Sequence, residues 1–343
     1  MKPIKKQFSL LKIMNIKLLM LSLVVISFLL ILASLTVGFY NISVKELYIL
    51  LFKSHEISGE TLASAAIILK NIRIPRIIAA FVIGSGLSMA GAAYQGMFKN
   101  PLVSPDILGV SSGAGLGAAL ALTIGLSDFM VQIYAFVFGI VVVSLAYFIG
   151  SHAKFGQDVS LVLAGSMLGA LSSSFITLLK YIADPVDTLP AITFWLMGSL
   201  SKITPSSLLF SLFPMAVGGI VLFLLRWRLN ILTLGDEEAQ AIGIDPRTTR
   251  LIAVAAATII SASSVCLGGL IGWVGLMVPH ISRGIAGADY RRLLPVAALI
   301  GGSFLLLMDD LARSLSTMEL PLGVLTSVMG APFFIVLIVK RKR

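Results

Sequence analysis

Three consecutive carboxylates, Asp236, Glu237 and Glu238, stand in the segment LGDEEAQAIGID (residues 234–245). A group of carboxylates can bind a cation, exchange protons, or begin a helix, whose dipole favours negative side chains in the first turn. Gly243 follows at the spacing of a helix end. The pattern predicts a short helix with Asp236 as its N-cap residue. Such a helix could be a plain connector, or it could be a knob that fits the groove of a partner protein.

A second group of charges, Asp309, Asp310 and Arg313, lies in an otherwise apolar stretch. An ion-coupled carrier would use buried carboxylates of this kind as ion or proton sites. Arg313, however, follows the two aspartates at three and four residues, which is the spacing of ion pairs on a helix. Of these two interpretations the spacing favours a structural ion pair, which contributes only tenths of a kcal/mol if it is exposed.

Other catalytic patterns are missing from the sequence. No Gly is followed by Lys, so the chain has no phosphate-binding loop for ATP. His152 and His280 have no Cys or carboxylate at metal-ligand spacing, and Cys266 is the only cysteine. We therefore expect no metal site, no disulfide and no bound cofactor, and we interpret Cys266 as a packing residue.

The amino-acid composition indicates that the helices that carry these residues lie in a lipid bilayer. The 343 residues are 57% hydrophobic and 12% charged, far fewer charges than the roughly 25% of a soluble domain. The predicted fold is an all-α membrane protein in a single domain (1–343), since a spanning helix needs about 20 apolar residues. The ten predicted spans are 18–39, 77–97, 105–125, 129–150, 159–181, 207–226, 248–268, 275–288, 293–313 and 321–339, with a shorter apolar piece at 190–199.

Charge bias orients the ten predicted spans. Most of the 26 Lys and Arg residues fall on one side if both termini are cytoplasmic, as the positive-inside rule requires. The net charge of +10 is thus explained by topology, and we expect no nucleic-acid partner. The sequence predicts a cytoplasmic segment at 1–17, an outer loop at 40–76 and a cytoplasmic loop at 227–247. The run at 18–39 is longer than the apolar part of a signal peptide, so it is predicted to stay as a span.

Two spans, 105–125 and 275–288, are interrupted by Gly, Pro and charged residues, and they correspond in an internal repeat. At a constant offset of 174 residues, Arg76 recurs as Arg250 and Pro105 as Pro279. This offset contains five helices, so the two copies must cross the membrane in opposite directions. Broken helices in inverted repeats indicate a substrate path in transporters. The candidate path residues are Asn100, Pro101, Ser104, Pro105, Gly109, Ser111, Ser112, Gly113 and Pro279; the alternative is that the small residues only let helices pack closely.

Four long motifs carry a resemblance to a known family: residues 72–118, residues 234–245, GLIGWVGLMVPHISR (269–283) and ELPLGVLTSVMGAPFFI (319–335). In this order they resemble the permease subunits of iron-siderophore and cobalamin ABC importers, the FecCD/BtuC type. The resemblance implies ten transmembrane helices in a BtuC-like inverted-repeat fold. It also implies a dimer of permease subunits, two cytoplasmic ATPase subunits that bind ATP and Mg, and an extracytoplasmic substrate-binding protein.

The resemblance assigns roles to two sets of residues. It implies that LGDEEAQAIGID, residues 234–245, is the coupling helix that docks on the ATPase. It further implies that Arg73, Arg76 and Arg313 pair with acidic residues of the binding protein, whereas the simpler alternative is that they extend to the membrane interface. The coupling-helix residues are Leu234, Gly235, Asp236, Glu237, Glu238, Ala239, Ala241 and Gly243.

The expected function is therefore a permease without enzymatic activity, located in the cytoplasmic membrane of a prokaryote. Its expected cargo is an iron-siderophore or a related chelate such as haem or cobalamin, since no residue distinguishes these ligands. An ion-coupled secondary transporter is the first alternative. A membrane-embedded hydrolase is the second, although its nucleophile and base constellation is missing from the spans.

Overall fold

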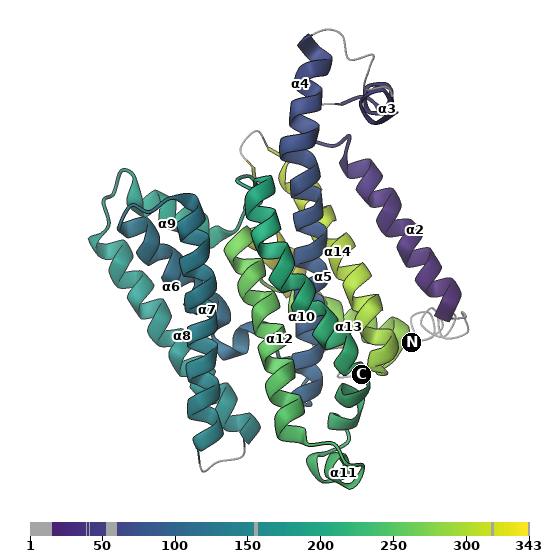
Figure 1. Ribbon diagram of the computed structural model, residues 1–343, viewed down its shortest axis with the longest axis vertical. Coiled ribbons are helices and arrows are strands. Elements are labelled where there is room, and N and C mark those ends of the chain that lie inside the picture. The colour runs from purple at the N-terminus through teal and green to yellow at the C-terminus, as the bar shows by residue number, and fades with distance from the viewer. Residues whose placement is uncertain are drawn as a thin grey trace.

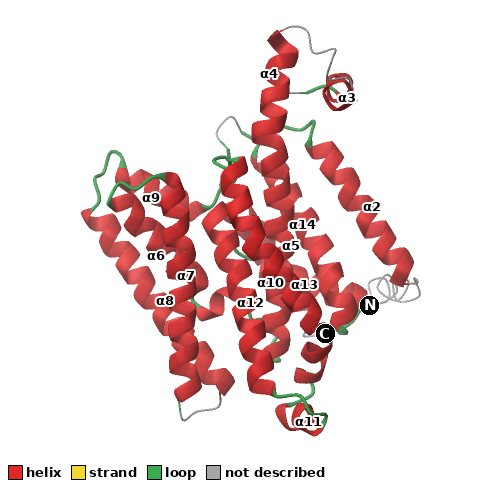
Figure 2. Cartoon of the chain, in the orientation of Figure 1, coloured by secondary structure: helices red, strands yellow, loops and turns green. Residues whose placement is uncertain are grey.

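The computed structural model describes residues 16–38, 40, 42–52, 60–153, 157–316 and 319–341, and within these ranges it contains helices and no strands (Figures 1 and 2). Two short elements have other helical geometries: η2 is a π-helical turn and η3 is a 3-10 helix. In chain order the elements are α2 (Ile16–Ser34), α3 (Val44–Phe52), α4 (Glu60–Ile68), η2 (Leu69–Arg73), α5 (Ile74–Met97), η3 (Pro105–Leu108), α6 (Val110–Thr123), α7 (Asp128–His152), α8 (Gln157–Ile182), α9 (Thr188–Met197), α10 (Pro205–Leu232), α11 (Asp236–Ala241), α12 (Pro246–Gly268), α13 (Val274–Ala286), α14 (Tyr290–Ala312) and α15 (Leu322–Arg341).

Each of the ten predicted spans coincides with a helix of the structure. Among the described residues, seven helices are long and apolar enough to cross a membrane, and α6, α9 and part of α15 form shorter apolar helices. The two spans predicted to be interrupted are short in the structure. Gly109, at φ 81°, separates η3 from α6, and α13 has only 13 residues. At 1.5 Å per residue α13 is about 20 Å long, too short to cross the hydrocarbon core alone.

The segment expected to be an outer loop, 40–76, is largely helical in the structure. It contains α3, and α4 continues through η2 into α5 as one long helix. The hydropathy pattern concealed this helix because Lys70, Asn71 and Arg73 interrupt the apolar run. Pro75 lacks the N–H that an α-helix needs, and the wider π turn precedes it, closed by the bond from the Ile74 N–H to the Leu69 carbonyl.

The two copies of the repeat run in opposite directions. In Figure 1, α5 continues downward from α4 at the top, whereas α12 rises from α11 at the bottom. The helices α5 and α12 contact each other in the middle of the molecule, and both are mostly buried. The two broken segments also meet: a Cβ atom on Gly275 of α13 would lie 2.7 Å from Cδ of Pro105 in η3.

Close approaches at glycines hold α5 against its neighbours. A Cβ atom added to Gly84 would lie 2.2 Å from the carbonyl oxygen of Gly301 on α14, and one added to Gly91 would lie 1.8 Å from that of Gly275 on α13. Inside a membrane, small residues at such crossings let helix backbones approach and gain dispersion energy. The alternative interpretation of the small residues as packing positions therefore holds for these glycines.

The helix α2 lies at the edge of the bundle, beside α14 (Figure 1). Most of its surface is exposed, as expected for a helix that faces lipid. Two serines fix it: Ser27 and Ser303 share a hydrogen bond of 2.8 Å, and the Ser34 hydroxyl donates to Asp310 at 2.6 Å. Inside a membrane, apolar side chains contact lipid about as favourably as they contact another helix. These interhelical hydrogen bonds therefore give α2 a defined position against α14.

Candidate functional sites at the two ends of the bundle

At the lower end of the bundle in Figure 1, the carboxylate triplet forms the first turn of α11, as the sequence predicts. The prediction of Asp236 as the N-cap residue was wrong by one position. Gly235 is the N-cap residue, and because glycine has no side chain the cap lacks a side-chain hydrogen bond. Asp236 instead bonds to the neighbouring helix α12, where the Nη2 atom of Arg250 donates to its Oδ1 atom at 3.1 Å. A buried guanidinium therefore decides where this carboxylate lies.

The far end of α11 closes at Gly243, as predicted. The Gly243 N–H donates to the Gln240 carbonyl, and the Ile244 N–H to the Ala239 carbonyl, both at 2.9 Å. This is a Schellman cap, and Gly243 takes the left-handed conformation it requires, at φ 82°. Ala239 is fully buried, so α11 rests on the bundle through this residue.

The outward side of α11 carries mixed charge and apolar surface. Glu237, Glu238 and Ala241 are exposed, and two large apolar side chains flank the helix: Leu234 is 64% exposed and Ile242 is 55% exposed. Ile242 was not among the predicted coupling-helix residues. An isoleucine that lies outside the spans, next to a helix-ending glycine, is a recognisable signal of an exposed apolar contact. This exposed surface projects from the bundle and is available to a partner.

The loop after α11 is held by Asp245, which the sequence analysis did not single out. Its carboxylate caps α12 by accepting hydrogen bonds from the backbone N–H groups of Arg247 and Thr248 at 3.1 and 3.2 Å, while Pro246 takes the first helical position. The Thr248 hydroxyl also donates to it, and these bonds lower the pKa of Asp245 below its ordinary value. The signal was an aspartate directly before a helix-opening proline.

At the opposite end, Arg76 holds two carboxylates. Its Nε atom lies 3.0 Å from both oxygens of Asp309, and its Nη1 atom lies 2.6 Å from Oε1 of Glu319. Asp309 is completely buried, whereas the Glu319 side chain is 37% exposed. Through these two carboxylates Arg76 joins α5 to α14 and to the segment before α15.

The other two outer arginines belong to the same network. Arg313 pairs with Asp310 and donates to the Ser34 carbonyl at 2.8 Å, and Arg73 donates to the Leu35 carbonyl at 2.6 Å. All three arginines are at least nine-tenths buried. The predicted pairing of Arg313 with the two aspartates is thus present, but as a buried network and not as an exposed surface pair. The guanidinium groups of all three arginines bond inside the chain, and both the docking role and the extension to the membrane interface stay predictions.

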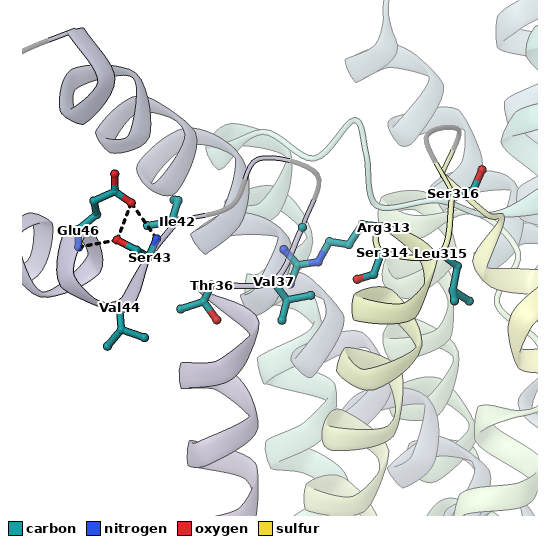
Figure 3. Close-up of a pocket in the computed structure, with 11 residues that line it drawn as sticks. Thr36, Val37, Ile42, Ser43, Val44, Glu46, Arg313, Ser314, Leu315 and Ser316 are labelled. Carbon is teal, nitrogen blue, oxygen red and sulfur yellow. Dashed lines mark hydrogen bonds between the residues drawn. The ribbon is translucent and has the colours of Figure 1, made fainter.

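An open groove of about 860 Å³ lies beside this network (Figure 3). Arg313 and residues 314–316 form one wall, and residues 36–38 and 42–44 with Glu46, between α2 and the first turn of α3, form the rest. Glu46 on the α3 side is occupied locally, since its carboxylate accepts hydrogen bonds of 2.8 Å from both the N–H and the hydroxyl of Ser43 (Figure 3). Arg313 is therefore the cation of this network that also borders the groove.

The predicted path residues separate into two groups. Asn100 and Pro101 are exposed and Ser104, Ser111 and Ser112 are half-buried, so they reach a surface of the chain. Pro105, Gly109, Gly113 and Pro279 are buried. Gly113 packs where a Cβ atom would lie 2.8 Å from the Phe138 carbonyl oxygen on α7. Close packing explains the burial of Gly113, and the path role of all nine residues stays a prediction.

A row of hydroxyl residues on α8 was not predicted. Ser166, Ser173, Ser174 and Thr177 are exposed and follow one another at helical spacing. Each hydroxyl donates to a backbone carbonyl three or four residues earlier in its own helix, at 2.9 or 3.0 Å. The hydroxyl protons are thereby satisfied, so this row can face lipid, protein or water.

Among the described residues no group of three or more His, Cys, Asp and Glu side chains is arranged to hold a metal ion. His152 contacts the Phe148 carbonyl at 2.8 Å, and the His280 ring lies against Phe333 and Phe334 of α15. Cys266 is buried next to Ser211, as expected for a packing residue.

The profile of the FecCD transport family matches residues 23–340 of this chain. The chain belongs to the FecCD transport family. The family match covers both ends of the bundle, so α11 and the outer arginine network lie within it. FecCD proteins of this kind are ABC transporter permeases, and this chain is accordingly a multi-pass membrane protein.

Two curated relatives illustrate the range of cargo. The molybdate import system permease protein MolB of Haemophilus influenzae is 38% identical over 90% of this chain and 92% of its own length. A Helicobacter pylori protein, named as a probable iron chelatin transport system permease, is 40% identical over 84% of this chain and 88% of its own length.

A solved structure gives the same fold. A transporter described as of the metal-chelate ABC type, in an inward-facing conformation, superposes with a TM-score of 0.85 at 35% identity, covering 94% of this chain and 99% of that one. The predicted ABC permease fold is thereby confirmed.

Proposed function

We propose that this FecCD permease is the membrane subunit of a binding-protein-dependent importer that carries an iron-siderophore or a related metal chelate such as haem or cobalamin. The single observation that carries the proposal is α11, a capped, exposed six-residue helix at one end of the bundle in a chain without a phosphate-binding loop. Such a knob suits a chain whose energy comes from a separate ATPase.

In the proposed assembly, a second permease subunit completes the path and two ATPase subunits bind ATP and Mg. They contact α11 through Glu237, Glu238 and the apolar flanks Leu234 and Ile242. An extracytoplasmic binding protein delivers the chelate at the opposite end. Closure of the ATPase pair upon ATP binding moves α11 and the helices attached to it as rigid bodies, which opens the path first to one side and then to the other.

The outer arginines have a proposed role in docking the binding protein. Arg313 borders the open groove, so an acidic side chain that enters the groove would meet a cation there. Charge complementarity of this kind mainly sets the register and the rate of association. Because all three arginines are buried and bonded within the chain, an acidic partner would have to exchange with an internal acceptor to reach any of them.

The cargo proposal is supported by the Helicobacter pylori relative with its iron chelatin name and by the metal-chelate type of the solved neighbour. MolB, with a similar identity, is named for molybdate, a small oxyanion. Uptake of a ferric siderophore, haem, cobalamin and molybdate by cells with and without the chain would distinguish these cargoes. Molybdate uptake alone that depends on the chain would overturn the chelate proposal.

The ATPase dependence is tested with the complex isolated from the native membrane. Replacing Glu237 and Glu238 together with Lys reverses two charges on the exposed side of α11, and we expect both the co-purified ATPase and transport to be lost. Lys202→Glu, an exposed charge reversal at the opposite end, serves as the control. Unchanged ATPase association and transport in the double variant would contradict the coupling role. Transport by the purified chain alone, driven by a proton gradient, would support an ion-coupled carrier instead.

A further inference from the structure

The internal repeat places two equivalent arginines at opposite ends of the molecule. Arg76 and Arg250, 174 residues apart, lie near the first residues of α5 and α12, the two central helices. Both side chains are almost completely buried, and each is bonded to a carboxylate on another element. Arg76 holds Asp309 of α14 at one end, and Arg250 holds Asp236 of α11 at the other.

In the pair between Arg250 and Asp236, the arginine side chain is buried in the bundle. Arg250 is 2% exposed, and its Nη1 and Nη2 atoms lie 3.1 to 3.4 Å from the two oxygens of Asp236, whose side chain is 49% exposed. A guanidinium presents its donors in a rigid planar fork, so it fixes the direction of the carboxylate as well as its distance. The buried member is on the long helix and the exposed member is on the short one.

Without this pair α11 would have few attachments. Gly235 precedes it and has no side chain to cap the helix, and the hydrogen bonds of Gly243 and Ile244 that close its other end are made to residues of α11 itself and not to a neighbouring helix. Buried Ala239 supplies one contact with the bundle, but an alanine is too small to prevent rotation of a helix of six residues. The Asp236–Arg250 pair adds the second attachment that determines its orientation.

The helix at the other end of the pair reaches the centre of the bundle. From Arg250 onward, α12 contacts α10, α5 and α7, and 17 of its 23 residues are buried. Its contact with α5 links it to the helix that packs on the broken segments, through Gly91 and Gly275. A rotation of α12 therefore cannot occur without movement of these neighbours, since close-packed interiors transmit displacement.

We propose that Asp236 and Arg250 are positioning residues that join α11 to α12 as one rigid unit, so that a force applied to α11 moves α12. The proposal rests on the proposed coupling function of α11. It divides the acidic triplet by role: Asp236 bonds to Arg250 and sets the orientation of the helix, whereas Glu237 and Glu238 are exposed and available to the ATPase, with the Glu238 carboxylate lying against Gly235.

Spin labels on the purified chain test the rigid attachment without any partner. In a Cys266→Ser background, labels at Gln240→Cys on α11 and Leu251→Cys on α12 report one inter-label distance, and both sites are exposed. We expect a narrow distance distribution that broadens in Asp236→Asn, which keeps the shape of the side chain and removes its charge. Glu237→Gln, the same change one residue later, is the matched control and should leave the distribution narrow. An unchanged distribution in Asp236→Asn would overturn the proposal.

In the transport complex, the amount of cargo transported per ATP hydrolysed distinguishes a role in coupling from a role in stability alone. With Asp236→Asn we expect the ATPase to remain bound while cargo transported per ATP hydrolysed falls roughly two- to thirtyfold, and Asp236→Glu to restore part of it. An unchanged transport-to-hydrolysis ratio would overturn the positioning role. If the wild-type chain binds no ATPase, the proposed function fails, whereas the spin-label result still decides whether α11 and α12 form one unit.

Discussion

At the scale of single residues, the buried arginines of the described chain are all bonded inside the protein. Arg76 is buried against Asp309 and Arg250 against Asp236, whereas Arg73 donates to a backbone carbonyl. An isolated ion in a medium of low dielectric constant is strongly destabilising, so a buried guanidinium requires acceptors at hydrogen-bond distance. The same two residue types at the protein surface contribute little, because water screens them.

The difference in energy between buried and exposed ion pairs predicts the effect of replacing Asp309. Asp309→Asn removes the buried carboxylate that Arg76 and Arg313 share; since Arg76 keeps Glu319 and Arg313 keeps Asp310, we expect a loss of stability of up to about 3–5 kcal/mol. The control is Asp128→Asn, which removes the exposed pair with Lys202 at 3.8 Å and should cost less than about 1 kcal/mol. Thermal unfolding of both variants in detergent measures the difference. Equal shifts of the two midpoints would show that burial does not determine the energy of the outer pair.

At the scale of helices, glycines decide how closely α5 approaches its neighbours. The Gly91 position has no room for a methyl group, because the backbone of α13 occupies the place of its Cβ atom. A shift of either helix would also separate Pro105 from Gly275, where the two broken segments meet. The contact between α5 and α13, which belong to the two copies of the repeat, therefore depends on the absence of a side chain at Gly91.

Gly91→Ala should destabilise the protein for this reason. Gly219 on α10 provides the control, since a Cβ atom there would meet nothing within 4 Å. Gly219→Ala should be neutral or stabilising by up to about 1 kcal/mol, because alanine favours a helix over glycine. Thermal unfolding and the yield of monodisperse protein report the outcome. A stable Gly91→Ala variant would mean that α5 and α13 can separate at little cost.

At the scale of the whole molecule, the two ends of the bundle are unlike. One end presents α11 with its exposed acids, and the other presents the buried arginine network beside an open groove (Figures 1 and 3). A transporter subunit needs such asymmetry, because different partners approach from the two sides of the membrane. The positive-inside bias predicts that α11 is on the cytoplasmic side.

Cysteine labelling tests this orientation. An impermeant maleimide applied to intact cells should label Lys202→Cys and not Gln240→Cys, whereas permeabilised cells should show labelling at both positions. The wild-type chain is the control, because Cys266 is buried and should stay unlabelled in its folded state. Labelling of Gln240→Cys alone in intact cells would place both termini outside and contradict the predicted topology.

The sequence by itself determined the class of fold, the ten helices, the inverted repeat and the place of the short helix. These follow from apolar runs, from Gly and Pro that end helices, and from the constant offset between Arg76 and Arg250. Each of these signals is local or periodic, so a single chain without relatives is enough to detect it. The continuous helix across 60–97 escaped detection because its polar residues look like a loop in a hydropathy profile.

Only the tertiary structure decided which charges face each other. Sequence spacing pairs Arg313 with Asp309 and Asp310, four residues apart at most, but it cannot pair Arg76 with Asp309 across 233 residues or Arg250 with Asp236 through a turn. Those pairs form where separate helices pack side by side, and packing depends on the shapes of many side chains at once. Burial then converts the same arginines from free surface charges into the groups that fix the two ends of the bundle.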